Sequence, residues 1–158
     1  MLNKKIKIMQ EIKELVKKLK SQNKKIAFCN GCFDVLHIGH IKFLEEAKKQ
    51  GDVLIVGLNS DSSVKENKSP KRPINTEENR ANILASLEMV DYVVIFSEKT
   101  PINLIETIKP DVFVNGAEYG ENCVEAPIVK KYGGKIHLVK NYFGLSTTEL
   151  INKISDTK

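Results

Sequence analysis

Five short apolar runs, which alternate with stretches of helical spacing, constrain the fold of this chain more than any other feature. The runs lie at residues 25–28, 53–58, 92–96, 112–116 and 135–139. Helical spacing covers residues 39–50, 76–89, 101–108 and 124–132, and a last helix is expected from about residue 147. Strands that are apolar throughout and separated by helices form parallel sheets covered on both faces. We therefore predict a doubly wound α/β domain with a five-stranded, mainly parallel sheet.

Residues 3–20 precede this pattern and have the spacing of an amphipathic helix. Its apolar positions lie among lysines and are Ile8, Ile12, Leu15 and Leu19. We divide the chain into an N-terminal helical extension, residues 1–22, and a main domain, residues 23–158. The apolar side of the helix either packs on its own domain or contacts a second copy in a homodimer. A helix that lies on a membrane surface is a third alternative.

Charge is distributed unevenly along the chain. The net charge is +5, yet residues 1–25 carry nine Lys and two Glu, and the remaining residues carry 16 basic and 18 acidic side chains. The main domain therefore lacks the general basic face of a nucleic-acid-binding protein. No apolar run approaches the roughly 20 residues of a membrane span, and the charged N-terminus is unlike a signal peptide. We expect a cytoplasmic protein that binds neither nucleic acid nor membrane and holds its anionic ligands locally.

Cys29 and Cys32 form a C-x-x-C pair, and Cys123 is the third cysteine. A redox pair normally opens a helix, whereas Cys29 ends an apolar run. A zinc site would need a second ligand pair near Cys123, which the sequence lacks. We expect ordinary reduced thiols and no metal held by protein ligands.

The loop after the first apolar run reads NGCFDVLHIGH, residues 30–40. In open parallel sheets, ligands bind beyond the carboxyl ends of the strands, where such loops meet helix N-termini. Gly31 allows the chain to turn, and Gly39 lets the backbone approach a ligand. His37 and His40 are three residues apart, so both rings can lie on one side of the helix start and donate to phosphate oxygens. A loop histidine is more often an ordinary polar residue, but two at one glycine-flanked turn favour a function.

A second polar segment, FGLSTTEL at residues 143–150, precedes the last helix. Ser146, Thr147 and Thr148 place three hydroxyls at a helix N-terminus, where free amides and the helix dipole favour an anion. Helix capping alone, which needs one hydroxyl, is the alternative.

The connection at residues 59–75 is the one long loop that we expect, and loops of this length are usually functional or mobile. With its continuation it contains Lys65 and the chain's two arginines, Arg72 and Arg80. The guanidinium group binds phosphate in a bidentate manner, although a solvated charged loop would have a similar composition. The three segments together indicate a site for a nucleoside triphosphate and a second phosphorylated ligand.

Two motifs carry a resemblance to a known family: Gly31-x-Phe33-Asp34-x-x-His37-x-Gly39-His40 and Gly144-x-Ser146-Thr147-Thr148. Over roughly residues 25–155 the chain resembles the cytidylyltransferase-like nucleotidyltransferases. The segments KRPIN, Glu78-x-Arg80 and Gly116-x-Glu118-Tyr119 are most similar to the heptose 1-phosphate adenylyltransferase domain of ADP-heptose synthase. The resemblance implies a Rossmann-like fold, ATP, a sugar 1-phosphate, and Mg²⁺ held mainly by the nucleotide phosphates.

The resemblance also implies roles for individual residues. The expected catalytic residues are His37, His40, Lys42 and Thr147. The expected nucleotide-binding residues are Asn30, Gly31, Cys32, Phe33, Gly39, Asn115, Gly116, Gly144, Ser146 and Thr148. The residues expected to bind the acceptor's phosphate or sugar are Asp34, Lys65, Arg72, Arg80, Glu118 and Tyr119.

The implied reaction transfers AMP from ATP to D-glycero-D-manno-heptose 1-phosphate and gives ADP-heptose and pyrophosphate. One alternative is a glycerol-3-phosphate or ethanolamine-phosphate cytidylyltransferase that uses CTP, because Lys42 is similar to a phosphate-binding lysine of the former enzymes. Another is a nucleotide-binding module without turnover. The small-molecule substrates are the expected partners, and a homodimer is left open. HIGH also occurs in class I aminoacyl-tRNA synthetases, but we expect no tRNA-binding body in 158 residues.

Overall fold

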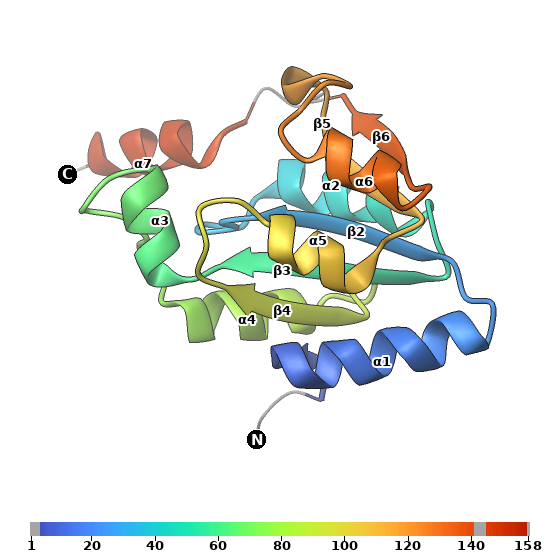
Figure 1. Ribbon diagram of the computed structural model, residues 1–158. Helices are drawn as coiled ribbons and strands as arrows, with labels where there is room; N and C mark the ends of the chain where they lie inside the picture. Colours follow the sequence, from blue (N-terminus) through green and yellow to red (C-terminus); the bar gives the residue numbers. More distant parts are fainter. Residues whose placement is uncertain (1–3, 141–144, 158) are drawn as a thin grey trace.

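The computed structural model describes residues 4–140 and 145–157 and contains a six-stranded sheet in this part of the chain (Figure 1). The strands are β1 (Ile6–Lys7), β2 (Ile26–Gly31), β3 (Val53–Asn59), β4 (Tyr92–Phe96), β5 (Val112–Gly116) and β6 (Lys135–Val139). Their order is β1-β4-β3-β2-β5-β6, and every pair is parallel. The prediction of a doubly wound α/β domain is confirmed.

The predicted number of five strands is wrong because β1 also joins the sheet. Ile6 pairs with Val93 and Lys7 with Val94 at the edge of the sheet. A two-residue strand is too short to show an alternating pattern, and these residues fall inside the window that predicted a helix from residue 3. The helix itself, α1 (Met9–Ser21), begins only after the strand.

The helices cover both faces of the sheet, with a hydrophobic core beneath each group (Figure 1). On one face, α1, α5 (Ile102–Ile108) and α6 (Ala126–Lys131) pack with Phe28 and Phe113. On the other face, α2 (Ile38–Lys48) and α4 (Glu77–Ala85) pack with residues of β3 such as Leu54. Strands buried on both sides explain why their sequences are apolar throughout.

The amphipathic helix α1 packs on its own domain. Ile12, Val16 and Leu19 are buried in the same core as Phe28 and Ile105. Full burial of an aliphatic side chain contributes about 1.5–3 kcal/mol, so these contacts fix the helix firmly. The apolar side of α1 is therefore covered by the domain itself and does not call for a dimer or membrane contact. The division of the chain at residue 22 stays a prediction. Among the described residues, no helix has the length and apolar character needed to span a bilayer.

The segment at residues 59–75 is not one long loop, because α3 (Asp61–Asn67) occupies its first half. The Ser60 side chain caps this helix by accepting a hydrogen bond from the backbone N–H of Ser63. The sequence of α3 lacks the apolar periodicity of a helix because one of the two residues that it buries, Ser63, is polar, and only Val64 is apolar. The remaining elements are η1 (Ala117–Tyr119) and α7 (Thr147–Ser155).

The chain order of the strands determines where a ligand can bind. From the central strand β2 the chain proceeds to β3 and β4 on one side, and then returns to β5 and β6 on the other. The direction of winding therefore changes beside β2. Crevices open at the carboxyl ends of the strands at such a point, and ligands bind there.

Candidate active site

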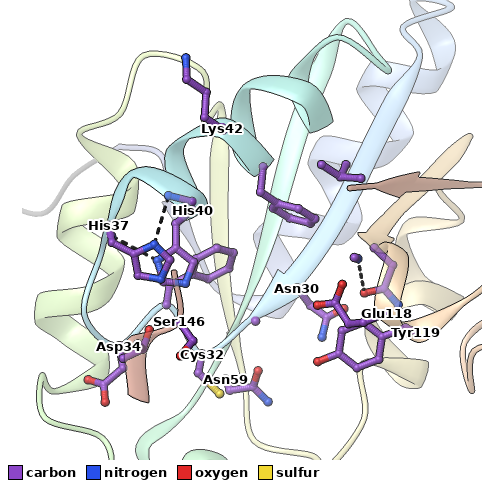
Figure 2. Close-up of a pocket in the computed structure, with 18 of the residues that line it drawn as sticks. Asn30, Cys32, Asp34, His37, His40, Lys42, Asn59, Glu118, Tyr119 and Ser146 are labelled. Atoms are coloured by element: carbon purple, nitrogen blue, oxygen red, sulfur yellow. Dashed lines mark hydrogen bonds between the residues drawn. The ribbon is translucent and has the colours of Figure 1, made fainter. Parts of the chain in front are cut away.

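A cavity of about 1100 Å³ lies at this change of winding, and most of the expected site residues line it (Figure 2). From the end of β2, the loop that follows it and the start of α2 come Asn30, Gly31, Cys32, Phe33, Asp34, His37, Gly39, His40 and Lys42. From other segments come Arg72, Asn115, Gly116, Glu118, Tyr119, Ser146, Thr147 and Thr148. Residues that are more than a hundred positions apart in the sequence thus line the same cavity.

His37 and His40 form a stacked pair at the N-terminus of α2, as Figure 2 shows. Their ring centroids are 3.9 Å apart. The backbone N–H of Gly39 donates to His37 Nδ1 at 3.1 Å, and the backbone N–H of His37 donates to His40 Nδ1 at 3.3 Å. Since each Nδ1 accepts a hydrogen bond, each neutral ring carries its proton on Nε2. The pair therefore has two Nε2–H donors available for a ligand.

The surroundings of the pair keep both rings neutral. Burial, together with the charge of neighbouring His37, lowers the pKa of His40 to about 4. Burial also lowers the pKa of His37 below its ordinary value. At neutral pH the two rings act as neutral hydrogen-bond donors rather than as cations.

Two local features hold the histidine pair in place. The backbone of Phe33 has a φ of 44°, in the left-handed region, so the chain turns sharply after β2. This turn places the Phe33 ring against His40, with ring centroids 5.4 Å apart. A Cβ at Gly39 would lie 2.9 Å from Cε1 of His37, so glycine is required for the ring to fold back over the helix start.

The N-terminus of α7 lies against the same cavity. Ser146 is its N-cap, because its Oγ accepts from the Glu149 backbone N–H at 3.1 Å while the Glu149 carboxylate accepts from the Ser146 N–H at 2.9 Å. Thr147 Oγ1 makes a long contact of 3.5 Å with the Val35 carbonyl, next to the histidine motif. Thr148 also lines the cavity. Gly144 lies outside the described residues.

Asp34 has a different role from the expected one of binding substrate. Its side chain has no exposed surface and accepts hydrogen bonds from Arg72 Nε at 2.6 Å and from the backbone N–H groups of Ile74 and Asn75. Burial by itself raises the pKa of Asp34, but the N–H groups of Asn75 and Ile74 and the guanidinium of Arg72 outweigh it and lower the pKa. Asp34 therefore fastens residues 72–75 to the histidine loop and orients Arg72, which lines the cavity.

Arg80 and Lys65 do not line the cavity, in contrast to the expectation for both. The Arg80 side chain is fully buried. It donates to the carbonyls of Cys32, Asn59 and Asn75 and to the Asp61 carboxylate, and so connects the segments after β2 and β3 and before α4. Lys65 lies exposed on α3. Sequence cannot distinguish an arginine that binds phosphate from one that binds carbonyl groups, because the residue type suits both.

Lys42 lies at the rim of the cavity. Its Nζ pairs with Glu45 at 2.8 Å along α2, and Figure 2 shows the side chain pointing away from the histidine pair. Both partners are about half exposed, so the pair contributes about 0–1 kcal/mol and leaves Lys42 able to turn toward a ligand.

Several polar residues of the cavity were not predicted from the sequence. Asn59, which ends β3, and Lys99, which follows β4, line it. Lys68, which follows α3 in the basic segment already expected at the site, lines it as well. His137 on β6 also lines it, with its Nε2 3.3 Å from the Glu46 carboxylate. Asn59 was detectable as a polar residue that ends a buried strand, whereas Lys99 stands among other polar residues with no distinguishing pattern.

The fold and this site together define an α/β domain of the nucleotidyltransferase class, with a histidine pair and the start of α7 beside a crevice next to β2. The comparison with known families agrees with this class. The chain belongs to the cytidylyltransferase-like family, whose sequence model matches residues 28–157.

Individual relatives extend this assignment. The chain is 51% identical over 151 residues to "Bifunctional protein HldE" of Geobacter metallireducens, and 53% identical over 157 residues to the protein of that name in Aliarcobacter butzleri. These matches cover 95% and 99% of the chain but 31% and 32% of the relatives, so the chain spans about a third of their length.

Two solved structures are similar to the domain. The lipopolysaccharide core biosynthesis protein from Thermoplasma volcanium has a TM-score of 0.61 and 31% identity, with 75% of this chain and 96% of that one covered. Pantoate-beta-alanine ligase from Francisella tularensis also has a TM-score of 0.61, covering 96% of this chain and 77% of that one. At 21% identity the second likeness concerns the fold alone.

Proposed function

We propose that this domain transfers AMP from ATP to D-glycero-D-manno-heptose 1-phosphate and releases ADP-heptose and pyrophosphate. The observation that carries the proposal is that three groups line one cavity: the neutral histidine pair, the N-terminus of α7, and the cations Lys68, Arg72 and Lys99 from the segments after α3 and β4. The motif resemblance to heptose 1-phosphate adenylyltransferases supports this acceptor. The similarity to a lipopolysaccharide core biosynthesis protein is consistent with a sugar nucleotide as product.

In the proposed reaction an oxygen of the sugar phosphate attacks the α-phosphorus of ATP. A bond forms between that oxygen and the α-phosphorus, and the bond from the α-phosphorus to the bridging oxygen of the β-phosphate breaks. A phosphate monoester has its second pKa at about 6, so at pH 7 the nucleophile is mostly ionised and no general base is needed. The domain must therefore act by positioning and by stabilising charge.

The described residues fit these two tasks. The Nε2–H groups of His37 and His40 donate to phosphate oxygens whose charge grows in the transition state. The free amides at the start of α7 bind the phosphates on the leaving side, near Ser146. Arg72, held in place by Asp34, and Lys68 and Lys99 attract the acceptor's phosphate. We place the nucleotide over β2 and β5 and the acceptor over β3 and β4. Glu118 and Tyr119, which follow β5, would then contact the nucleotide and not, as the resemblance implied, the acceptor.

Mg²⁺ is the metal that we expect with the triphosphate, where it neutralises phosphate charge. Among residues 4–140 and 145–157, no cluster of three or more His, Cys, Asp or Glu side chains could hold a metal ion. Asp34 is a buried carboxylate at the cavity, but it already accepts hydrogen bonds from Arg72 and from two backbone N–H groups. This donor set fits an ion bound mainly through nucleotide oxygens and water.

The decisive experiment is a substrate matrix with pyrophosphate release as the readout. ATP, CTP, GTP and UTP are each combined with heptose 1-phosphate, glycerol 3-phosphate and phosphoethanolamine. The proposal predicts the highest kcat/KM for ATP with heptose 1-phosphate. Preference for CTP with either of the other acceptors would replace it by a cytidylyltransferase, and nucleotide binding without turnover in any combination would reduce the domain to a binding module.

Location and assembly are also part of the proposal. We expect the reaction in the cytoplasm, with a homodimer left open as in the sequence-based expectation. Light scattering of the purified chain measures the assembly directly.

A further inference from the structure

The amide of Asn59 is held in one orientation by a hydrogen-bond network around Ser63. The Ser63 hydroxyl donates its one proton to the Glu98 carbonyl at 3.0 Å. Its oxygen can then only accept, and it does so from Asn59 Nδ2 at 2.9 Å and from Asn67 Nδ2 at 3.3 Å. Because the nitrogen of Asn59 must face Ser63, its Oδ1 is turned away from Ser63.

This oxygen is a fixed acceptor at the wall of the cavity. Asn59 is 5% exposed and lines the cavity (Figure 2). Its backbone carbonyl is held as well, by Arg80 Nη1 at 2.8 Å. Within the two described stretches of the chain, no group donates a hydrogen bond to Asn59 Oδ1. Since no buried side-chain oxygen or nitrogen of the described residues lacks a partner, Asn59 Oδ1 keeps surface open to the cavity, and a ligand hydroxyl there can donate to it in place of water.

The neighbouring charges select the kind of donor. Lys68, Arg72 and Lys99 line the same cavity as Asn59, and burial raises the pKa of the Cys32 thiol while the charges of Lys68 and Arg72 act to lower it. A cationic donor such as an ammonium group would be repelled by Lys68 and Lys99, while the charge of Arg72 is balanced by Asp34. A neutral hydroxyl is not repelled, and the phosphate attached to the same molecule is attracted.

We propose that Asn59 is a specificity-determining residue whose Oδ1 accepts a hydrogen bond from one hydroxyl of the phosphorylated acceptor. The inference rests on the proposed function and adds to it: the acceptor must carry a hydroxyl within reach of Asn59 when its phosphate lies on the cations. The domain therefore discriminates against an acceptor that lacks this hydroxyl, and against phosphoethanolamine.

The test is a double-mutant cycle between the enzyme and its substrate. Wild type and Asn59→Ala are assayed for pyrophosphate release with heptose 1-phosphate and with each of its singly deoxygenated analogues. Loss of one buried hydrogen bond predicts that Asn59→Ala lowers kcat/KM for the acceptor about 10- to 100-fold with the KM for ATP unchanged. With wild type, one of the deoxy analogues should lower kcat/KM by a similar factor. With Asn59→Ala, the same analogue should give the same kcat/KM as heptose 1-phosphate, because the hydrogen bond is already lost.

Two further variants separate this role from a structural one. Asn59→Asp keeps an oxygen at the same place, so its absolute rate falls but it retains the penalty for the same deoxy analogue. Asn82→Ala removes an asparagine on α4 that bonds the Glu78 carbonyl outside the cavity, and both KM values should stay unchanged. If Asn59→Ala fails to fold, the kcat/KM values of wild type and Asn59→Asp with the set of deoxy analogues still test the proposal.

The proposal is overturned if the effects of Asn59→Ala and of every deoxy analogue multiply independently, or if the KM for ATP rises together with that for the acceptor. Failure of the proposed function gives a different result. In that case wild type does not use heptose 1-phosphate, and the same cycle is run with glycerol 3-phosphate and its deoxy analogues.

Discussion

Arg80 offers a prediction that separates two roles which the sequence could not distinguish. As a phosphate-binding residue, Arg80→Met would raise a substrate KM and leave stability unchanged. The structure instead buries the guanidinium completely among three carbonyls and the Asp61 carboxylate, at 2.7 to 3.0 Å. Removal of the side chain leaves the carbonyls without donors and Asp61 without its partner.

The expected loss follows from these contacts. An unsatisfied buried acceptor costs about 1–3 kcal/mol, and breaking a buried charge pair costs about 3–5 kcal/mol. Three carbonyls at the lower bound of about 1 kcal/mol each give about 3 kcal/mol. Asp61 is a third exposed and can be rehydrated, so it adds little, and we expect a total of about 3–4 kcal/mol. Arg80→Lys keeps the charge but not the forked geometry and should lose about half as much.

Urea unfolding of the purified chain measures this difference. The matched control is Arg72→Met, whose side chain is 15% exposed and whose Nε makes one bond, to Asp34. It should lose less stability than Arg80→Met and raise the acceptor KM more. An Arg80→Met variant that unfolds at the wild-type urea concentration, yet binds its acceptor weakly, would refute the structural role.

The other predictions concern the histidine pair and the loop held by Asp34. His40→Ala should lower kcat about 10²–10³-fold, measured by pyrophosphate release, with the fold retained; near wild-type turnover would contradict the mechanism. The folded pKa of His40, about 4, lies below its ordinary value of 6.5, so the unfolded state binds more protons between these values. The free energy of unfolding should therefore fall as the pH drops from 6.5 to about 4, and His40→Asn should weaken that fall; equal slopes would show that His40 titrates normally. Asp34, whose pKa is lowered, stabilises the fold above its unfolded pKa and loses this contribution as the pH falls through its folded pKa. Asp34→Asn should lower the free energy of unfolding by about 1–3 kcal/mol at pH 7, measured by urea unfolding. It should also raise the acceptor KM by releasing Arg72; an unchanged KM would show that Asp34 does not orient Arg72 for the acceptor.

Much of the fold could be predicted because burial leaves a direct mark on sequence. The inner strands β2, β3, β4 and β5 bury most of their residues and appear as apolar runs such as residues 53–58, whereas the edge strand β6 is only partly buried. The elements that escaped prediction lack this mark. β1 has two residues at the sheet edge, and α3 buries Ser63, whose polarity is balanced by three hydrogen bonds.

The candidate site could be predicted where a motif is local and not where tertiary contacts assign the role. The spacing of His37 and His40 and the glycines beside them indicated the site directly. Asp34 and Arg72 were both expected to contact substrate, but only their pairing across 38 positions shows that one orients the other. Asn59 was missed because its function depends on the side toward which its amide is turned, and Ser63 determines that side.

The central claim is that an oxygen of a sugar phosphate attacks the α-phosphorus of ATP in this cavity. The most direct measurement uses heptose 1-phosphate labelled with ¹⁸O in its phosphate group, incubated with ATP, Mg²⁺ and the purified chain, with both products analysed by mass spectrometry. The account predicts ADP-heptose that retains all of the label and pyrophosphate that carries none. Label in the pyrophosphate, or ATP consumed without any ADP-heptose, would contradict it.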